Sequence, residues 1–126
     1  MKKIIFTDKA PAPIGPYSQA VSAGNMLYTS GQIALHPETG ELITSDIEAE
    51  TKQVMENMKA VLDAAGTNFG NVIKATIFIS NMDDFARINA IYGSYFEEAN
   101  APARETVQVA KLPKNVNVEI SMIALL

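Results

Sequence analysis

Two charged side chains near the end of the chain are of types that can do chemistry together. Arg104 stands two places after Pro102 and opens a strand-like run, and Glu119 is the one carboxylate in the last apolar strand. A guanidinium fixed beside a proline-stiffened segment can grip a planar anion through two parallel N–H···O bonds. The two residues therefore indicate a small site that holds a carboxylate-bearing molecule beside an acid or a base.

The hydrophobic pattern predicts the elements that must position these residues. Alternating and β-branched runs indicate strands, Gly24-Asn25 indicates a tight hairpin turn, and apolar residues at helical spacing indicate two helices. The first helix begins at a capping box of Ser45 and Glu48 and closes at Gly66. The predicted order is strands at 3–6 and 21–32, the first helix, a strand at 72–80, a second helix from about 83, and strands at 104–110 and 116–124.

The apolar faces of the two helices are expected to form the core against one face of a sheet. Two helices cannot cover both faces, so the other face must be solvated or must contact another molecule. The buried stripes comprise Ile47, Thr51, Val54, Met55, Met58, Val61, Leu62 and Ala65 in the first helix, and Phe85, Ile88, Tyr92 and Phe96 in the second.

Alternation along the last two strands assigns their side chains to the two faces. Phe78, Ile123 and Leu125 fall on the face away from the helices, which predicts an oligomer interface with a site at the subunit boundary. Glu105 should point away from Arg104 and leave its charge free. The helix-facing set is Val107, Val109, Val116, Val118, Ile120 and Met122, and the opposite set is Arg104, Thr106, Gln108, Asn117, Glu119, Ser121 and Ile123.

Composition narrows the classes of function. The 126 residues, 48% of them apolar, predict one domain spanning residues 1–126. A formal net charge of −4 without a basic stripe argues against nucleic acid and anionic membranes as partners. The chain has no cysteine, and its one histidine, His36, precedes Pro37 in a turn-like stretch. We therefore expect no thiolate nucleophile, no histidine triad and no metal site.

The first residues and the length of the apolar runs bear on location. The chain begins Met-Lys-Lys-Ile-Ile-Phe and turns polar at Thr7, short of the apolar region of a signal peptide. No apolar run approaches the length that crosses a bilayer. We expect a cytoplasmic protein whose partners are small molecules or copies of itself.

Several short motifs are spread in order over nearly the whole chain. They are Ala-Pro-Ile-Gly-Pro-Tyr-Ser-Gln-Ala at 12–20, Leu-Tyr-Thr-Ser-Gly-Gln at 27–32, Pro37 with Thr39-Gly40, Asp84-Phe85 with Asn89 and Tyr92, Pro102 with Arg104, and Leu112-Pro113 before Val118-Glu119-Ile120. In content and spacing this set resembles the Rid family of reactive-intermediate deaminases, also called YjgF-like proteins.

The resemblance implies an α+β fold of the chorismate-mutase-like type, with a mixed β-sheet and two helices packed on one face. It implies a homotrimer with three clefts between subunits. It also implies hydrolysis of 2-iminobutanoate and 2-iminopropanoate to 2-oxo acids and ammonia, without cofactor or metal. These reactive imines arise when pyridoxal-phosphate dehydratases act on threonine or serine.

The resemblance also gives roles to individual residues. Arg104 would clamp the substrate carboxylate, and Glu119 would orient or deprotonate the attacking water. The main-chain carbonyl of Thr106 would be a second acceptor for that water. Tyr17 would close the pocket from a neighbouring subunit with its hydroxyl near the substrate nitrogen. Each cleft would thus combine Tyr17 of one subunit with Arg104 and Glu119 of the next.

Further candidates and two departures complete the expected site. Ser30 and the N–H of Gly31 are candidate donors to the ligand, and glycine allows the backbone to approach closely. Asn89 fits ligand contact and the ordering of a neighbouring loop equally well. Many relatives carry cysteine at the position of Thr106 and glutamate at that of Ser121, which removes a charge near Glu119.

Other readings of the same residues stay open. On the strand pattern alone, Arg104 and Glu119 fit two solvated strand residues. A regulatory protein could use Arg104 to bind a 2-oxo acid or similar carboxylate without catalysis. Some relatives are linked to RNA cleavage, which the acidic charge and the single histidine argue against here. Imine hydrolysis is the leading hypothesis.

Overall fold

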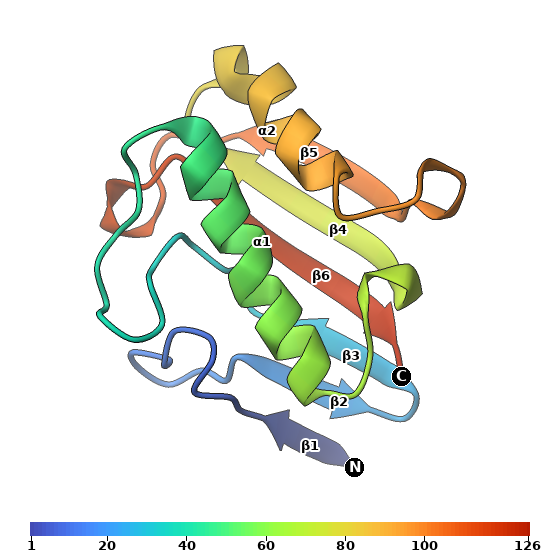
Figure 1. Ribbon diagram of the computed structural model, residues 1–126. Coiled ribbons are helices and arrows are strands. Elements are labelled where there is room, and N and C mark those ends of the chain that lie inside the picture. The colour runs from blue at the N-terminus through green and yellow to red at the C-terminus, as the bar shows by residue number, and fades with distance from the viewer.

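A computed structural model describes residues 1–126 as one six-stranded sheet and two α-helices (Figure 1). The strand order is β1-β2-β3-β6-β4-β5, with β4 and β5 parallel and the other neighbours antiparallel. The bounds are β1 Lys2–Ile5, β2 Ala20–Ala23, β3 Met26–Thr29, α1 Ile47–Ala64, β4 Val72–Ile79, α2 Phe85–Gly93, β5 Ala103–Gln108 and β6 Val118–Leu125, with short 3-10 turns at Phe69–Asn71, Met82–Asp84, Glu98–Asn100 and Pro113–Asn115.

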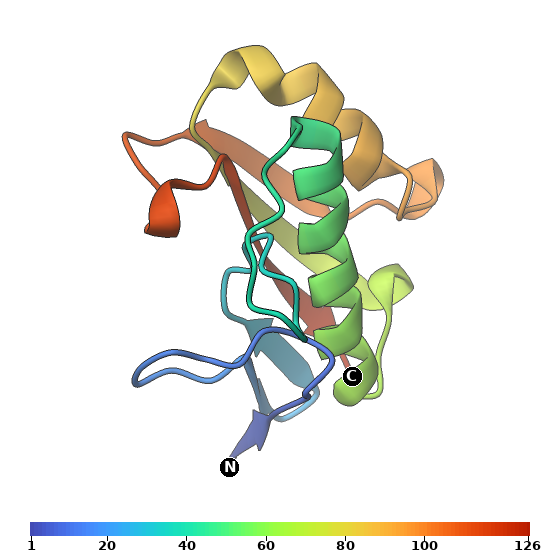
Figure 2. The same ribbon diagram turned by 60° about the vertical axis from the view of Figure 1, so that its left-hand side comes forward.

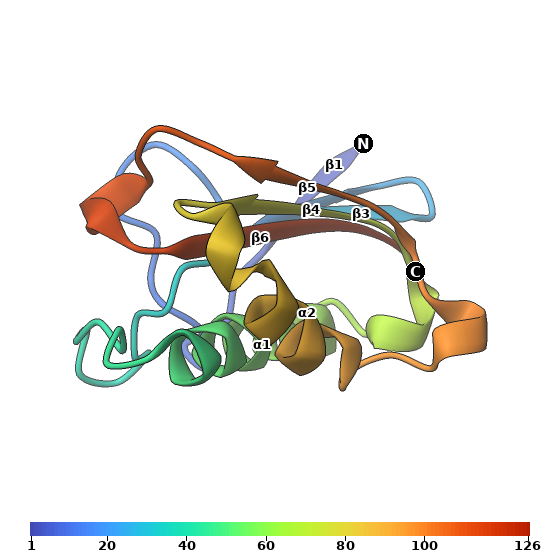
Figure 3. The same cartoon turned by 90° about the horizontal axis from the view of Figure 1, so that it is seen from above.

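Both helices lie on one face of the sheet, and the other face is uncovered (Figure 3). The core fills the space between the helices and the inner side of β3, β4 and β6. The predicted stripe of α1 is confirmed, since all its members from Ile47 to Leu62 are buried and Ala65 packs against the core. This is the mixed sheet with two helices on one face that we expected.

The ends of α1 are set by one polar and one glycine residue. The side chain of Asp46 accepts a hydrogen bond from the N–H of Ala49 at 2.7 Å. The predicted cap at Ser45 is therefore wrong by one residue, because the adjacent aspartate offers the same capping chemistry. At the other end, Gly66 has a φ of +81° and its N–H donates to the carbonyl of Asp63, as glycine favours after a helix.

The hairpin prediction is confirmed, with a shorter second strand. Gly24 adopts a φ of +60° in the turn between β2 and β3. Strand β3 ends at Thr29, and Gln32 forms only an isolated bridge with Ile120. The chain between them leaves the sheet, which frees Ser30 and Gly31 to line a site. The other predicted strand ends shift by at most two residues.

Strand β5 faces the opposite way from the prediction. Val107 pairs with Phe78 on the uncovered face and is 42% exposed, whereas Arg104 pairs with the fully buried Ala75 on the helix side. The error has a physical cause: β5 is an edge strand with few apolar residues, so alternation gives its period but not which side meets the core. The assignment of β6 is confirmed, with Val118, Ile120 and Met122 buried.

No α-helix here combines the length and the hydropathy that a membrane crossing requires.

Candidate functional site

Glu119 lines a cavity of about 560 Å³ at one end of the sheet. Its walls come from the N-terminal loop, the segment after β3 and the loop before β6. Figure 2 shows the N-terminal loop (blue) and the loop before β6 (orange-red) projecting to the same side. Tyr17, Ser30 and Gly31 line this cavity together with Glu119. The structure thus brings four of the candidate residues together in one chain.

A close approach by Gly31 shapes the surroundings of Glu119. A Cβ atom on Gly31 would lie 2.6 Å from Oε2 and 2.7 Å from the carboxyl carbon of Glu119, so no other residue fits without displacing that side chain. The N–H of Gly31 donates to no acceptor within the chain. Glycine was predicted here as a donor to the ligand; its missing side chain also makes room for the carboxylate.

Burial raises the pKa of Glu119, whose carboxylate forms no hydrogen bond or ion pair within the chain, although Lys114 lines the same cavity. Desolvation disfavours the charged form of a carboxyl group, which makes the carboxylate a stronger base than an exposed glutamate. A carboxylate that is half-buried and without a partner is suited to accept a proton from a bound water.

The N-terminal wall of the cavity is held by Gln19, which is buried. Its side chain accepts from the N–H of Thr7 at 2.8 Å and donates to the carbonyls of Thr7 and Pro11 at 2.9 Å. The hydroxyl of Ser30 donates to the carbonyl of Ser18 at 2.5 Å, so its proton is already used within the chain. Sequence reasoning placed Gln19 only inside a motif and missed this role.

Glu50 is a second residue that supports the site and that the sequence did not reveal. It is fully buried on α1, and Oε2 accepts from the N–H groups of Asn117 and Val118 at 2.7 and 3.3 Å. Its Oε1 accepts from the side-chain amide of Asn117 at 2.8 Å. These bonds fix the chain where it enters β6, immediately before Glu119. The only signal was a carboxylate near the buried stripe of α1.

Arg104 lies on the helix side of β5, against α2. Its Nη1 donates to Oδ1 of Asn89 at 2.6 Å, and its guanidinium carbon lies 5.1 Å from the ring centre of Tyr92 and 5.6 Å from that of Phe85. It forms no ion pair. Arg87, the other arginine, pairs with Asp84 and Glu48. The positive charge of Arg104 is therefore available to an anion from outside the chain.

Two buried hydroxyl groups near Arg104 in the fold have no hydrogen-bond partner. They belong to Tyr92 and to Thr106, whose paired residue in β4 is the buried Ile77. Burial raises the pKa of Tyr92 to about 12, although the nearby charge of Arg104 opposes the shift. Strand β5 is the last strand of the sheet, so one of its edges has no partner strand. Glu105 points away from Arg104, as predicted, but to the uncovered face, because the faces of β5 are reversed; Lys74 lies 3.0 Å from it there.

The predicted site is therefore divided between two places in the chain. Arg104, Asn89 and Thr106 lie on or toward the helix side of the sheet, whereas Glu119 opens to the cavity on its other face, paired with Phe78. The expectation that Arg104 and Glu119 share a face is wrong, because the face of β5 is reversed. Tyr17, which was expected to reach Glu119 from another subunit, lines the same cavity as Glu119 within one chain.

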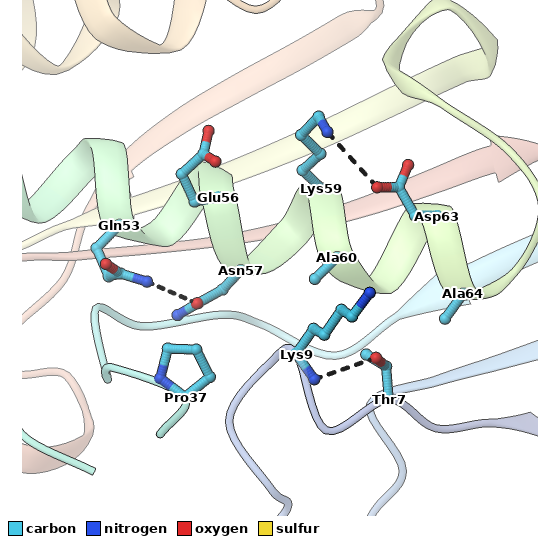
Figure 4. A pocket seen from close by; sticks show the side chains of 10 residues that line it. All are labelled: Thr7, Lys9, Pro37, Gln53, Glu56, Asn57, Lys59, Ala60, Asp63 and Ala64. Atoms are coloured by element: carbon cyan, nitrogen blue, oxygen red, sulfur yellow. Dashed lines mark hydrogen bonds and ion pairs between the residues drawn. The ribbon is translucent and has the colours of Figure 1, made fainter. Parts of the chain in front are cut away.

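Other candidates add no chemistry to either place. His36 lies in a loop, where Nδ1 accepts from the N–H groups of Glu38 and Thr39. No three His, Cys, Asp or Glu side chains converge to hold a metal ion. A polar groove of about 440 Å³ lies between α1 and the N-terminal loop (Figure 4), where Lys59 pairs with Asp63 and Gln53 with Asn57.

Comparison with known proteins identifies the family. The family described as endoribonuclease L-PSP matches residues 7–126. The chain belongs to this family, the YjgF/Rid family. It is 52% identical over 124 residues to a RutC family protein of Pyrococcus horikoshii, covering 98% of each chain. It is 49% identical over 126 residues to the 2-iminobutanoate/2-iminopropanoate deaminase of Escherichia coli strain K12, again covering 98% of each.

The solved structures extend this relationship to the fold. The structure of E. coli TdcF with bound serine is 48% identical, with a TM-score of 0.92 over 98% of each chain. The chorismate-mutase-like α+β fold that the resemblance implied is confirmed.

Proposed function

We propose that this protein is a deaminase that hydrolyses 2-imino acids, with 2-iminobutanoate and 2-iminopropanoate as substrates, to 2-oxo acids and ammonia. One observation carries the proposal: the chain holds an arginine without an anionic partner and a half-buried glutamate whose pKa is raised and which has no partner. A 2-imino acid has a carboxylate for the first residue and an electrophilic C=N carbon for water activated by the second. The name of the E. coli relative at 49% identity supports the same reaction.

The reaction is the addition of water followed by loss of ammonia. Arg104 binds the substrate carboxylate through two N–H groups and so fixes the position of the C=N carbon. Glu119 accepts a proton from water as its oxygen attacks that carbon and the C=N pair of electrons moves to nitrogen. The proton then passes from Glu119 to the nitrogen, which gives a carbinolamine. The hydroxyl proton of this intermediate passes to its amino group, the C–N bond breaks as the C=O bond forms, and ammonia leaves. Water supplies the oxygen, and no redox partner is needed.

The two halves can meet only if they come from two copies of the chain. Arg104 and Glu119 face opposite sides of one sheet, so a cleft that contains both needs Arg104 from one subunit and Tyr17, Ser30, Gly31 and Glu119 from the next. The uncovered face supports such an assembly. It exposes Tyr28, Val107 and Leu125 by 40 to 44%, beside the half-buried Phe78 and Ile123. We propose a homotrimer with three such clefts.

A coupled assay tests the proposed reaction. A threonine dehydratase generates 2-iminobutanoate, and the formation of 2-oxobutanoate is followed with and without this protein. We expect acceleration that depends on protein concentration. Glu119→Gln keeps the size of the side chain but removes the base, so turnover should fall by on the order of a hundredfold while 2-oxobutanoate still binds. Full turnover in this variant would remove Glu119 from the mechanism.

The arginine variants separate binding from chemistry. Arg104→Lys should lose ligand affinity nearly as completely as Arg104→Ala, because a point charge cannot reproduce a two-pronged contact. Arg87→Ala is the matched control and should bind and turn over as wild type does. Calorimetric titration with 2-oxobutanoate reports affinity in each variant. Binding that depends on Arg104 without any acceleration in the coupled assay would favour a regulatory protein that binds carboxylates.

A further inference from the structure

We infer that Phe85 and Tyr92 are positioning residues for Arg104: with Asn89 they form a neutral cradle on α2 that orients the guanidinium toward a carboxylate. The inference deepens the proposed function, since it rests on Arg104 as the carboxylate clamp. It assigns to α2 a part in substrate recognition beyond its part in the core.

The spacing of the three residues places them along one side of α2. Phe85, Asn89 and Tyr92 lie at positions i, i+4 and i+7, which share a helix face. Tyr92 is buried and Phe85 is partly buried against the core, so neither ring is free to move away. Phe96 packs on Tyr92 with ring centres 4.8 Å apart. The cradle is thus built into the packing of the helix.

The two rings and the amide act on different parts of the guanidinium. The guanidinium carbon lies over both rings, at 5.1 Å from the centre of Tyr92 and 5.6 Å from that of Phe85, within the range of a cation–π contact. Oδ1 of Asn89 accepts from Nη1 at 2.6 Å and fixes the rotation of the group in its plane. No protein acceptor takes the N–H groups of Nε and Nη2, the edge that a carboxylate binds side-on.

The cradle is neutral, so it can orient the guanidinium of Arg104 without neutralising its charge. A carboxylate at position 89 would orient the guanidinium equally well but would compete with the ligand for it. Aromatic faces and an amide oxygen hold the group without cancelling its charge. Arg87 shows the contrasting case on the same helix, since Asp84 and Glu48 occupy its guanidinium.

The hydroxyl of Tyr92 is not needed for this role. It is buried without a hydrogen-bond partner, and a phenol whose pKa is raised to about 12 stays neutral beside Arg104. Tyr92→Phe keeps the ring and removes an unsatisfied polar group, which is neutral or favourable for stability. Tyr92→Leu removes the ring itself. These two variants therefore separate the aromatic face from the hydroxyl.

Ligand affinity in a set of variants tests the cradle. Phe85→Leu and Tyr92→Leu should each weaken 2-oxobutanoate binding by about tenfold, and Tyr92→Phe should restore most of the loss at that position. Asn89→Asp should weaken binding more than Asn89→Ala, because it adds the competing carboxylate. Phe69→Leu is the matched control: Phe69 packs on Tyr95 and Phe96 but on neither cradle ring and not on Arg104, so affinity should not change.

Two further measurements test the cradle independently of turnover and of overall folding. The neutral analogue 2-oxobutanamide should bind wild type and all cradle variants with the same affinity, since it lacks the carboxylate. Nitrogen NMR of the Arg104 side chain, without ligand, should show slow rotation of the guanidinium in wild type and Phe69→Leu and fast rotation in Phe85→Leu and Tyr92→Leu.

The outcomes distinguish the cradle from the proposed reaction. Fast rotation in wild type, or wild-type affinity for 2-oxobutanoate in both leucine variants, would overturn the cradle even if the imine is hydrolysed. Slow rotation that the leucine variants abolish would support the cradle even if the coupled assay shows no acceleration. If wild type binds no 2-oxobutanoate, the proposed ligand fails and the NMR measurement alone decides the cradle.

Discussion

The glutamate region and the arginine region of this chain are built in opposite ways. Glu119 lies in a cavity made by three loops, where the missing side chain of Gly31 leaves room for the carboxylate. Arg104 is exposed on an edge strand, and side chains of one helix fix it. The first region partly removes a carboxylate from solvent and raises its pKa. The second holds a cation in the open without neutralising it.

The difference shows what each region lacks. A half-buried carboxylate gains from a positive charge close by, and an exposed guanidinium gains from an anion and a wall that excludes water. Each region can supply what the other lacks, yet the sheet separates the two within one chain. This complementarity is the physical reason to expect that the active protein contains more than one copy.

Complementation between two inactive variants tests whether the two regions meet between copies of the chain, and it has the largest expected effect. Glu119→Gln keeps the arginine region intact, and Arg104→Ala keeps the glutamate region intact. Mixed, unfolded and refolded together, random assembly should give about a quarter of sites with both intact halves. Turnover in the coupled assay should therefore rise from near zero to about a quarter of the wild-type value.

A second mixture serves as the control for this experiment. Wild type refolded with the double variant Arg104→Ala, Glu119→Gln should retain about a quarter of its sites if they lie between chains, and about half if each lies within one chain. No recovery in the first mixture together with half retention in the second would place both halves in a single chain and sink the shared cleft.

The sequence predicts the glutamate region better than the arginine region, for a physical reason. Strand β6 carries four alternating apolar residues, Val118, Ile120, Met122 and Ala124. The pattern therefore predicts which side of β6 meets the core, and that Glu119 lies on the other side. In β5 the only large apolar residue is Val107, which meets the uncovered face instead. Periodicity fixes which residues share a side, but only burial fixes which side is inside.

Contacts between distant segments lay outside what the sequence could reveal. The helices and the hairpin follow from local spacing and turn chemistry. Gln19 and Glu50 act through partners that lie far along the chain, with Glu50 and Asn117 separated by 67 positions. A polar residue in such a role looks the same in sequence as one on a surface, because only the fold supplies its partners.

Removing Glu50 tests how the glutamate region is held. Glu50→Ala leaves the N–H groups of Asn117 and Val118 and the amide of Asn117 without their acceptor, which should cost about 3 kcal/mol of unfolding free energy. Glu48→Ala is the control on the same helix. Its exposed ion pair with Arg87, at 3.9 Å, should contribute no more than about 0.5 kcal/mol. Equal losses in chemical denaturation would show that Glu50 does not hold the entry to β6.

Gly31→Ala tests the close approach to Glu119. The added methyl group would lie 2.6 Å from Oε2, so the carboxylate must shift, and turnover should fall by about tenfold. Binding of 2-oxobutanoate should change less, since Arg104 is not affected. Gly93→Ala is the control, because nothing lies within 4 Å of a Cβ atom there. Wild-type turnover in Gly31→Ala would mean that the position of Glu119 is not critical.

The smallest expected effect is a gain in stability when Glu119 loses its charge. Burial raises the pKa of Glu119, so the folded state binds this proton more tightly than the unfolded state does. Above the raised pKa the ionised carboxylate therefore lowers stability, and Glu119→Gln should melt at a higher temperature than wild type at pH 7. As the pH falls below the ordinary pKa of glutamic acid, about 4.3, both side chains are neutral and the two melting temperatures should converge.

Melting temperatures measured in an Arg104→Ala background test whether the charges of Arg104 and Glu119 interact. If Arg104 of a second copy faces Glu119 across the cleft, its charge offsets part of the cost of burying the carboxylate. The gain from Glu119→Gln at pH 7 should then be larger with Arg104→Ala than with arginine present. Equal gains in the two backgrounds would mean that the two charges do not interact. Arg104 of a second copy would then not lie near Glu119, which would contradict the shared cleft.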